Sequence, residues 1–125
     1  MSRIEWITYK NKKIVYADYS NLNSTKPEEE KELINAIHEV KNLIASLSEK
    51  TLFLTNATNS VANTNTINAL KEVTKLSASK GNVEKECIVG ITGIKKTLLS
   101  TVNYLTGSKV KSFDTLQEAK DWLVS

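Results

Sequence analysis

One apolar run constrains the fold of this chain more than any other stretch. It spans residues 86–94, reads Glu-Cys-Ile-Val-Gly-Ile-Thr-Gly-Ile, and continues directly into a helical pattern. Ile and Val without polar alternation are typical of a strand covered on both faces, and Gly93 allows a sharp turn from strand to helix. We therefore predict a buried central strand here, with Ile88, Val89 and Ile91 in the core. Helix N-termini at such turns offer unpaired N–H groups to anions and partners.

The segments before and after this run alternate between strand and helix patterns. β-branched and aromatic residues over 4–9 and 13–19 predict a hairpin. Pro27 with three following glutamates predicts the start of an amphipathic helix. The remaining predicted elements are a strand over 51–55, a helix from Ile67 that ends at Gly81, a helix with the stripe Ile94, Leu98, Val102 and Leu105, a strand over 109–113, and a last helix capped by Asp114 with Gln117 as its capping-box partner.

The order of these elements, β-β-α-β-α-β-α-β-α, predicts the fold class. Strands that alternate with helices favour right-handed crossovers and a mainly parallel sheet, to which the N-terminal hairpin adds one antiparallel strand. The length of 125 residues suits one domain. We therefore predict a single α/β domain over residues 1–125, built on a mostly parallel five-stranded sheet.

The charge pattern excludes several classes of protein. The net charge of +3 is too small for the concentrated basic surface of a nucleic-acid binder, and the lysines at 10, 12 and 13 suit a solvated hairpin tip. Charged residues interrupt the first twenty positions, which argues against a signal peptide, and no apolar run approaches the length of a membrane span. We expect a cytoplasmic protein with no transmembrane segment and no nucleic-acid partner.

The sequence contains no recognisable catalytic or metal-binding pattern. His38 is the only histidine, and it has no nearby cysteine or second histidine with which to bind zinc. Cys87, the only cysteine, lies within the apolar run, which favours a buried apolar residue over a nucleophile. We expect a protein that is not an enzyme and that binds neither a metal nor a cofactor.

Two stretches are candidates for binding. Gly90, Thr92 and Gly93 form a turn that is able to cradle an anion, although the spacing is not that of a P-loop and tight packing explains the glycines equally well. Residues 56–66 are nearly all of types that cap helices or hydrogen-bond their own backbone. We predict that this second segment is the working surface of the protein.

Four features together resemble one protein family. They are the element order, the strand that ends at Asn-Ala-Thr over 56–58, the Val-Gly-Ile-Thr-Gly turn over 89–93, and the tail Phe-Asp-Thr-Leu-Gln-Glu-Ala-Lys-Asp-Trp-Leu over 113–123. In these features the chain is similar to the STAS superfamily, the fold of sulfate transporter domains and anti-sigma-factor antagonists. Within that superfamily it most resembles the stand-alone bacterial proteins that are SpoIIAA-like.

The resemblance implies a non-enzymatic module that binds a switch-type kinase or another regulator through the loop after the third strand and the helix that follows. In the anti-sigma-factor antagonists this loop reads Asp-x-Ser-Gly, and its serine is phosphorylated. Here Asn56 takes the place of the Asp, Thr58 of the Ser and Asn59 of the Gly, so all three matched positions differ. Thr58 is thus a candidate phospho-acceptor beside a predicted helix N-terminus. The alternative is that Thr58 or Ser60 merely caps that helix.

A carrier or sensor of a lipid or another small apolar ligand is the second functional hypothesis. The resemblance includes a related branch of the superfamily that is similar to lipid-binding proteins. An open sheet with helices mostly on one face has room for a pocket, for which Trp6, Tyr16, Tyr19 and Phe53 are the candidate lining residues. Ordinary packing of these aromatic side chains in the core and hairpin is the alternative.

Overall fold

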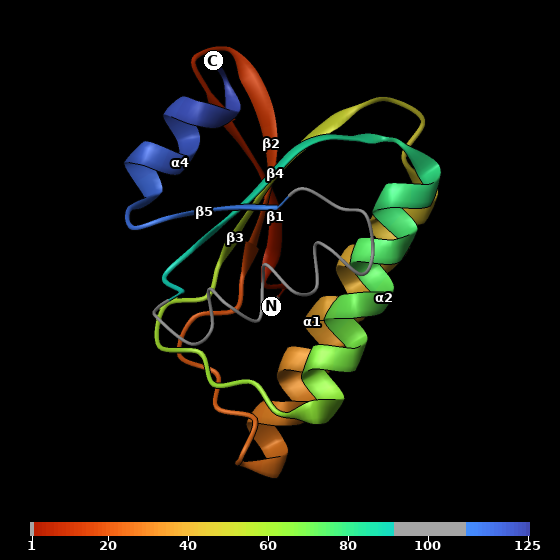
Figure 1. Ribbon diagram of the computed structural model, residues 1–125, viewed down its shortest axis with the longest axis vertical. Helices are drawn as coiled ribbons and strands as arrows, with labels where there is room; N and C mark the ends of the chain where they lie inside the picture. The colour runs from red at the N-terminus through yellow and green to blue at the C-terminus, as the bar shows by residue number, and fades with distance from the viewer. Residues whose placement is uncertain (1, 92–109) are drawn as a thin grey trace.

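The computed structural model describes residues 2–91 and 110–125, and the described elements follow the predicted order (Figure 1). They are β1 (Ile4–Tyr9), β2 (Lys12–Asp18), α1 (Pro27–Ser46), β3 (Thr51–Asn56), α2 (Thr64–Lys80), β4 (Val83–Val89), β5 (Lys111–Phe113) and α4 (Leu116–Leu123). The helix predicted from Ile94 to Leu105 lies outside the described residues.

The described strands form one five-stranded sheet in the order β1-β2-β3-β4-β5. β1 pairs with β2 in the antiparallel sense, and the other three pairs are parallel. This arrangement confirms the predicted fold class, an α/β domain with a mostly parallel sheet and an N-terminal hairpin.

The position predicted for the central strand is wrong in two respects. The middle strand of the sheet is β3, whereas β4 lies between β3 and β5. β4 also ends at Val89, because Gly90 takes a φ of +88° that interrupts the extended backbone. Val89 and Ile91 are buried as predicted, but Ile88 is only partly buried. Ile91 reaches the core from beyond the end of the strand.

Helices cover both faces of the sheet, α1 and α2 side by side on one face and α4 on the other (Figure 1). Successive residues of a strand point to opposite faces, so the two cores alternate along each strand. Val15, Ala17 and Phe53 pack with α1 and α2, whereas Leu54 and Cys87 pack with α4. β3 is therefore apolar on both faces, which explains its short uninterrupted Leu-Phe-Leu run.

Local sequence signals account for most helix ends. Pro27 is the first residue of α1, and Gly81 ends α2 with a φ of +66°, both as predicted. The predicted cap of the last helix is wrong by one residue, because Thr115 and not Asp114 accepts the hydrogen bond from the N–H of Glu118, at 3.2 Å. Gln117 is not part of this cap.

Candidate functional site

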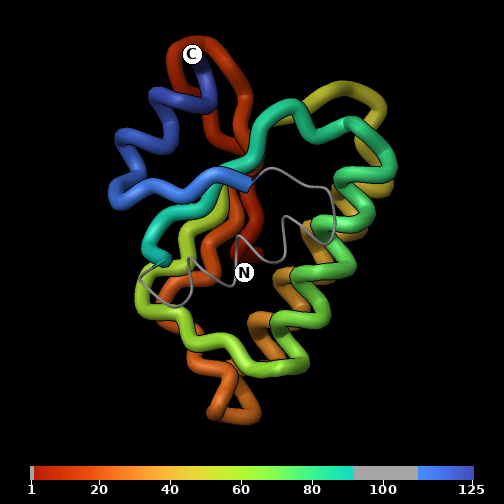
Figure 2. Tube along the Cα trace, in the orientation of Figure 1, coloured from red at the N-terminus to blue at the C-terminus, as the bar shows by residue number. Residues whose placement is uncertain are grey.

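The loops that follow β2 and β3 are joined to each other by backbone hydrogen bonds. The N–H of Tyr19 donates to the carbonyl oxygen of Asn56 at 2.8 Å, and the N–H of Asn21 donates to that of Thr58 at 2.9 Å. Further along, the N–H of Val61 donates to Leu22 at 2.9 Å and the N–H of Ser24 donates to Val61 at 2.8 Å. We call residues 19–24 and 56–61 the paired loops; they run side by side beyond the sheet (Figure 2).

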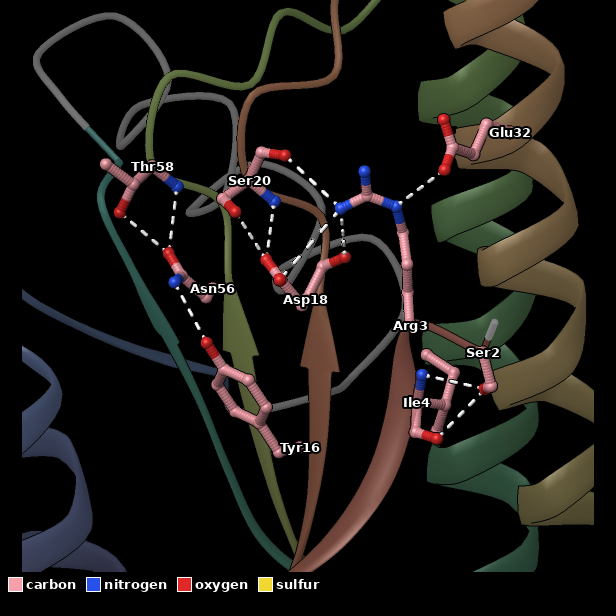
Figure 3. Close-up of polar contacts among 9 residues, drawn as sticks. All are labelled: Ser2, Arg3, Ile4, Tyr16, Asp18, Ser20, Glu32, Asn56 and Thr58. Carbon is pink, nitrogen blue, oxygen red and sulfur yellow. Dashed lines mark hydrogen bonds and ion pairs between the residues drawn. The ribbon is translucent and has the colours of Figure 1, made fainter.

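Asn56 organises the turn at the end of β3 (Figure 3). Its side-chain oxygen accepts hydrogen bonds from the backbone N–H of Thr58 at 3.1 Å and from the Thr58 hydroxyl at 2.7 Å. Its side-chain nitrogen donates to the hydroxyl of Tyr16 at 3.0 Å. This Asx-type turn fixes the backbone of Thr58 and leaves the residue itself exposed.

The predicted cap of this helix at Thr58 or Ser60 is wrong, and Thr58 does not lie at the N-terminus of α2. α2 begins only at Thr64, and its cap is Asn63, whose side-chain oxygen accepts from the N–H of Thr66 at 3.0 Å. The Thr66 hydroxyl accepts from the N–H of Asn63 at 2.8 Å and completes a capping box. The turn after β3 and the start of α2 are thus two separate structures, the first stabilised by Asn56 and the second by Asn63.

The four predicted loop residues differ in what they offer a partner. Thr58 and Asn59 are exposed, Asn56 is partly buried within its turn, and Ser60 is buried. Asn59 has a φ of +57° and donates a side-chain hydrogen bond, 3.3 Å long, to Asn21 on the neighbouring loop. Asparagine tolerates this left-handed conformation better than most residues. The Asn59 side chain is therefore presented from a defined backbone position.

Gly90 packs directly against this turn. A Cβ atom at Gly90 would lie 2.6 Å from the Cα of Thr58, so only glycine allows the end of β4 to approach so closely. The N–H of Ala57 also donates to the carbonyl oxygen of Val89 at 2.8 Å. Thr92 and Gly93 lie outside the described residues, and the anion-binding turn stays a prediction.

Arg3, the only arginine of the chain, holds the first of the paired loops in place (Figure 3). Its guanidinium group donates to the carbonyl oxygens of Asp18 at 3.1 Å and Ser20 at 3.4 Å, and to a carboxylate oxygen of Glu32 in α1 at 3.0 Å. No local sequence pattern indicates this role, because the contacts join three segments far apart along the chain.

A second feature is a cavity of about 170 Å³ between the sheet and helices α1 and α2. Two of the four residues of the predicted aromatic pocket, Tyr19 and Phe53, line it. The other two predicted residues do not: Tyr16 packs on the α4 side of the sheet, and Trp6 is 50% exposed on the edge strand β1. Sheet alternation explains the position of Tyr16, which points to the face opposite that of its neighbours in β2. The lining also includes Leu33, Val40, Thr55, Ile67, Leu70, Val73 and Thr74.

One charged side chain, Glu86, lies on the wall of this cavity. Burial raises its pKa to about 7. Burial also raises the pKa of the Tyr19 hydroxyl, and the Glu86 charge raises it further. Sequence reasoning missed Glu86 as a cavity residue. It placed this residue at the start of an apolar strand and did not assign the sheet face to which the side chain points.

Residues 2–91 and 110–125 contain neither an exposed thiol nor a cluster of side chains suited to a metal. Cys87 is buried, as predicted, and burial together with the Glu86 charge raises the pKa of its thiol to about 12. No cluster of three His, Cys, Asp or Glu side chains suited to a metal occurs in these ranges, and His38 is exposed.

None of the helices described in residues 2–91 and 110–125 is both long and apolar enough to span a membrane.

Comparison with known proteins identifies the fold. No family model matches the chain, and no curated protein matches it in sequence. Among solved structures, an uncharacterised DUF3478-family protein with a SpoIIAA-like fold, from Shewanella loihica PV-4, superposes with a TM-score of 0.56 at 15% identity. The match covers 96% of this chain and 91% of that protein. At this identity the likeness concerns architecture alone, and it agrees with the strand order and helix placement described above. The chain therefore has a SpoIIAA-like fold.

Proposed function

We propose that this domain is a non-enzymatic regulatory module that binds a protein partner through the paired loops and the start of α2. The observation that supports the proposal is the backbone pairing of residues 19–24 with residues 56–61. Binding to a surface that is already ordered avoids much of the conformational entropy lost when flexible loops bind. The surface also lies beyond the carboxyl ends of β2 and β3, where open α/β sheets place their sites.

Thr58 gives this surface a means of regulation by a kinase. Its hydroxyl is exposed and donates to the side chain of Asn56. Phosphorylation would replace that donor by a group with a charge of about −2 and acceptor oxygens only, and so would remove this hydrogen bond and set negative charge against the Asn56 side-chain oxygen. A partner that recognises the unmodified turn would then be released.

The proposal is tested with a photoreactive side chain introduced at Asn59, which is exposed in the paired loops, and at Ser48, which is exposed beyond the C-terminal end of α1. A partner should crosslink from the Asn59 position and not from the Ser48 position. The captured protein is then titrated with wild type, Thr58→Glu and the matched variant Ser48→Glu. We expect Thr58→Glu to weaken binding by about tenfold or more, because an unpaired carboxylate has to be desolvated at the interface.

Equal affinities for the two glutamate variants would remove the paired loops from the mechanism. Crosslinking from Ser48 alone would place the partner at the opposite end of the sheet.

The cavity supports a second candidate function, a carrier or sensor of a small apolar ligand. Its wall is formed mostly by apolar side chains of α1, α2 and the sheet, which is typical of ligand pockets. Native mass spectrometry of the purified protein tests this function, since a bound molecule adds a fixed mass that is lost on denaturation. A spectrum with only the mass of the polypeptide would count against a tightly bound ligand.

A further inference from the structure

Glu86 faces the cavity because of its register in the sheet. It is the partner of Phe53 across the parallel pair of β3 and β4, and paired residues point to the same face. Phe53 belongs to the core under α1 and α2, so Glu86 points into that core and not toward α4. A carboxylate therefore lies on a sheet face whose other cavity-lining groups are mostly apolar.

This carboxylate has no compensating group among the described residues. Among residues 2–91 and 110–125, no hydrogen bond or ion pair to Glu86 is found, while five salt bridges form on the outer surface. The charges of Glu86 and Glu39 both raise the pKa of the Tyr19 hydroxyl, so two carboxylates act on the Tyr19 end of the cavity. Glu86 is partly buried. A charge that is partly withdrawn from water without a partner is costly, and a ligand that supplies a cation would reduce that cost.

We infer that the cavity binds small ligands that combine an apolar body with a protonated amine, the amine pairing with the Glu86 carboxylate. This inference rests on the carrier function proposed above. The Tyr19 hydroxyl, on the same cavity wall, is a second group able to accept a hydrogen bond from the amine. Anionic ligands such as carboxylates are disfavoured by the same charge.

The cavity volume sets the size of the probes. An apolar cavity of about 150 Å³ in another protein accommodates benzene, and the volume here is about 170 Å³. Benzylamine, benzyl alcohol and benzoate are therefore suitable, because they share one ring and differ only in the head group. Binding to the full chain is measured by calorimetric titration above pH 7, the approximate pKa of Glu86, so that the carboxylate is ionised.

Two variants distinguish the effect of the Glu86 charge on binding from the effect of the cavity itself. Glu86→Gln keeps the side-chain shape and removes the charge, and Glu84→Gln removes the same charge from an exposed position on the same strand, outside the cavity lining. We expect wild type and Glu84→Gln to bind benzylamine about tenfold or more tightly than benzyl alcohol, as a charge-assisted hydrogen bond allows. Glu86→Gln should lose this preference and still bind benzyl alcohol.

The possible failures are distinct. If wild type binds benzyl alcohol as tightly as benzylamine, the charge selection is overturned and the cavity remains an apolar pocket. An unchanged benzylamine affinity in Glu86→Gln would also overturn the role of Glu86. If none of the three probes binds, both the inference and the carrier function are overturned.

Discussion

At the scale of single residues, the protonation of Glu86 is coupled to folding between pH 4.5 and about pH 7. Its pKa rises from 4.5 to about 7 on folding, because burial disfavours the charged form. The folded protein therefore holds a proton that the unfolded chain releases in this range. This stabilisation is complete below pH 4.5 and is lost as the pH rises through 7.

Glu86→Gln should remove this pH dependence. Between about pH 5 and about pH 8, wild type should lose roughly 1–3 kcal/mol of unfolding free energy relative to Glu86→Gln, in proportion to the pKa shift. Tyr19 and Cys87, the neighbours that feel the Glu86 charge, have raised pKa values and do not titrate in this range. Urea unfolding at the two pH values measures the difference, with Glu84→Gln as a control that should follow wild type. Parallel pH profiles for wild type and Glu86→Gln would show that Glu86 is solvated.

Gly90 and Gly81 allow a second test at this scale, because both have a positive φ but differ in their surroundings. A Cβ at Gly90 would collide with Thr58, whereas a Cβ at Gly81 would meet no atom within 4 Å. Gly81→Ala should therefore cost only the left-handed strain of about 1 kcal/mol, and Gly90→Ala should cost about 2–4 kcal/mol. Chemical denaturation of the two variants compares them, and equal losses would mean that the approach of Gly90 to Thr58 is not tight.

At the scale of elements, the start of α2 depends on one side chain that reaches three neighbours. Besides capping the helix, Asn63 donates to the carbonyl oxygen of Ser24 at 3.0 Å and to the carboxylate of Glu30 in α1. The cap thus joins the helix to the first paired loop and to the other helix on the same face. The geometry of the proposed partner surface depends on this junction.

Replacing the cap should have a larger effect than replacing its neighbour in the same helical turn. Asn63→Ala should lower the unfolding free energy by about 1–2 kcal/mol, since it removes the cap and its two further hydrogen bonds. Asn65→Ala, at an exposed position of the first turn, should stay within about 0.5 kcal/mol of wild type. Thermal and urea unfolding measure both variants, and a loss at Asn65 equal to that at Asn63 would argue against the assigned cap.

The elements that the sequence predicted best are those with local signals. Pro27 and Gly81 act within one helical turn of their own position, so their effects can be read without knowing the rest of the fold. Asn56 and Thr58 were also placed correctly at the end of a buried strand. The helix after them was predicted from Ile67 with Thr58 or Ser60 as an alternative cap, whereas it begins at Thr64 after its cap Asn63. The cap was hard to place because a run of Asn, Ser and Thr residues is equally suited to an Asx-type turn and to a helix cap.

The residues that sequence reasoning missed act over long separations. Arg3 joins β1 to the loop after β2 and to α1, and no spacing along the chain announces such contacts. The direction of Glu86 depends on the register between β3 and β4, which a single strand pattern does not specify. The same limit explains why Trp6 and Tyr16 were assigned to a pocket that they do not line.

At the scale of the whole molecule, the reactivity of Cys87 shows whether the core between the sheet and α4 is intact. The thiol is buried between the sheet and α4, with its sulfur 4.0 Å from the carbonyl oxygen of Ala119. A thiol reagent reaches it only when α4 leaves the sheet or the domain unfolds. Its reactivity therefore measures the cooperativity of the fold.

We expect Cys87 to react with an aromatic disulfide reagent only when urea unfolds the protein. The urea dependence of the labelling should equal that of global unfolding, because α4 packs on β3, β4 and β5 as part of one core. The variant Ser48→Cys provides the control and should react at once with one equivalent. Labelling of wild type that is fast and independent of urea would mean that α4 opens without the rest of the domain.

The strand order has a consequence for how the sheet is assembled during synthesis. The strands lie across the sheet in the order in which they occur along the chain. Each new strand therefore adds to the open edge left by its predecessor, and none has to be inserted between two strands that are already paired. A ribosome delivers the chain in that same direction, so the N-terminal hairpin and β3 are able to pair before β4 and β5 have been made. Translation and sheet growth then advance from the same end of the molecule.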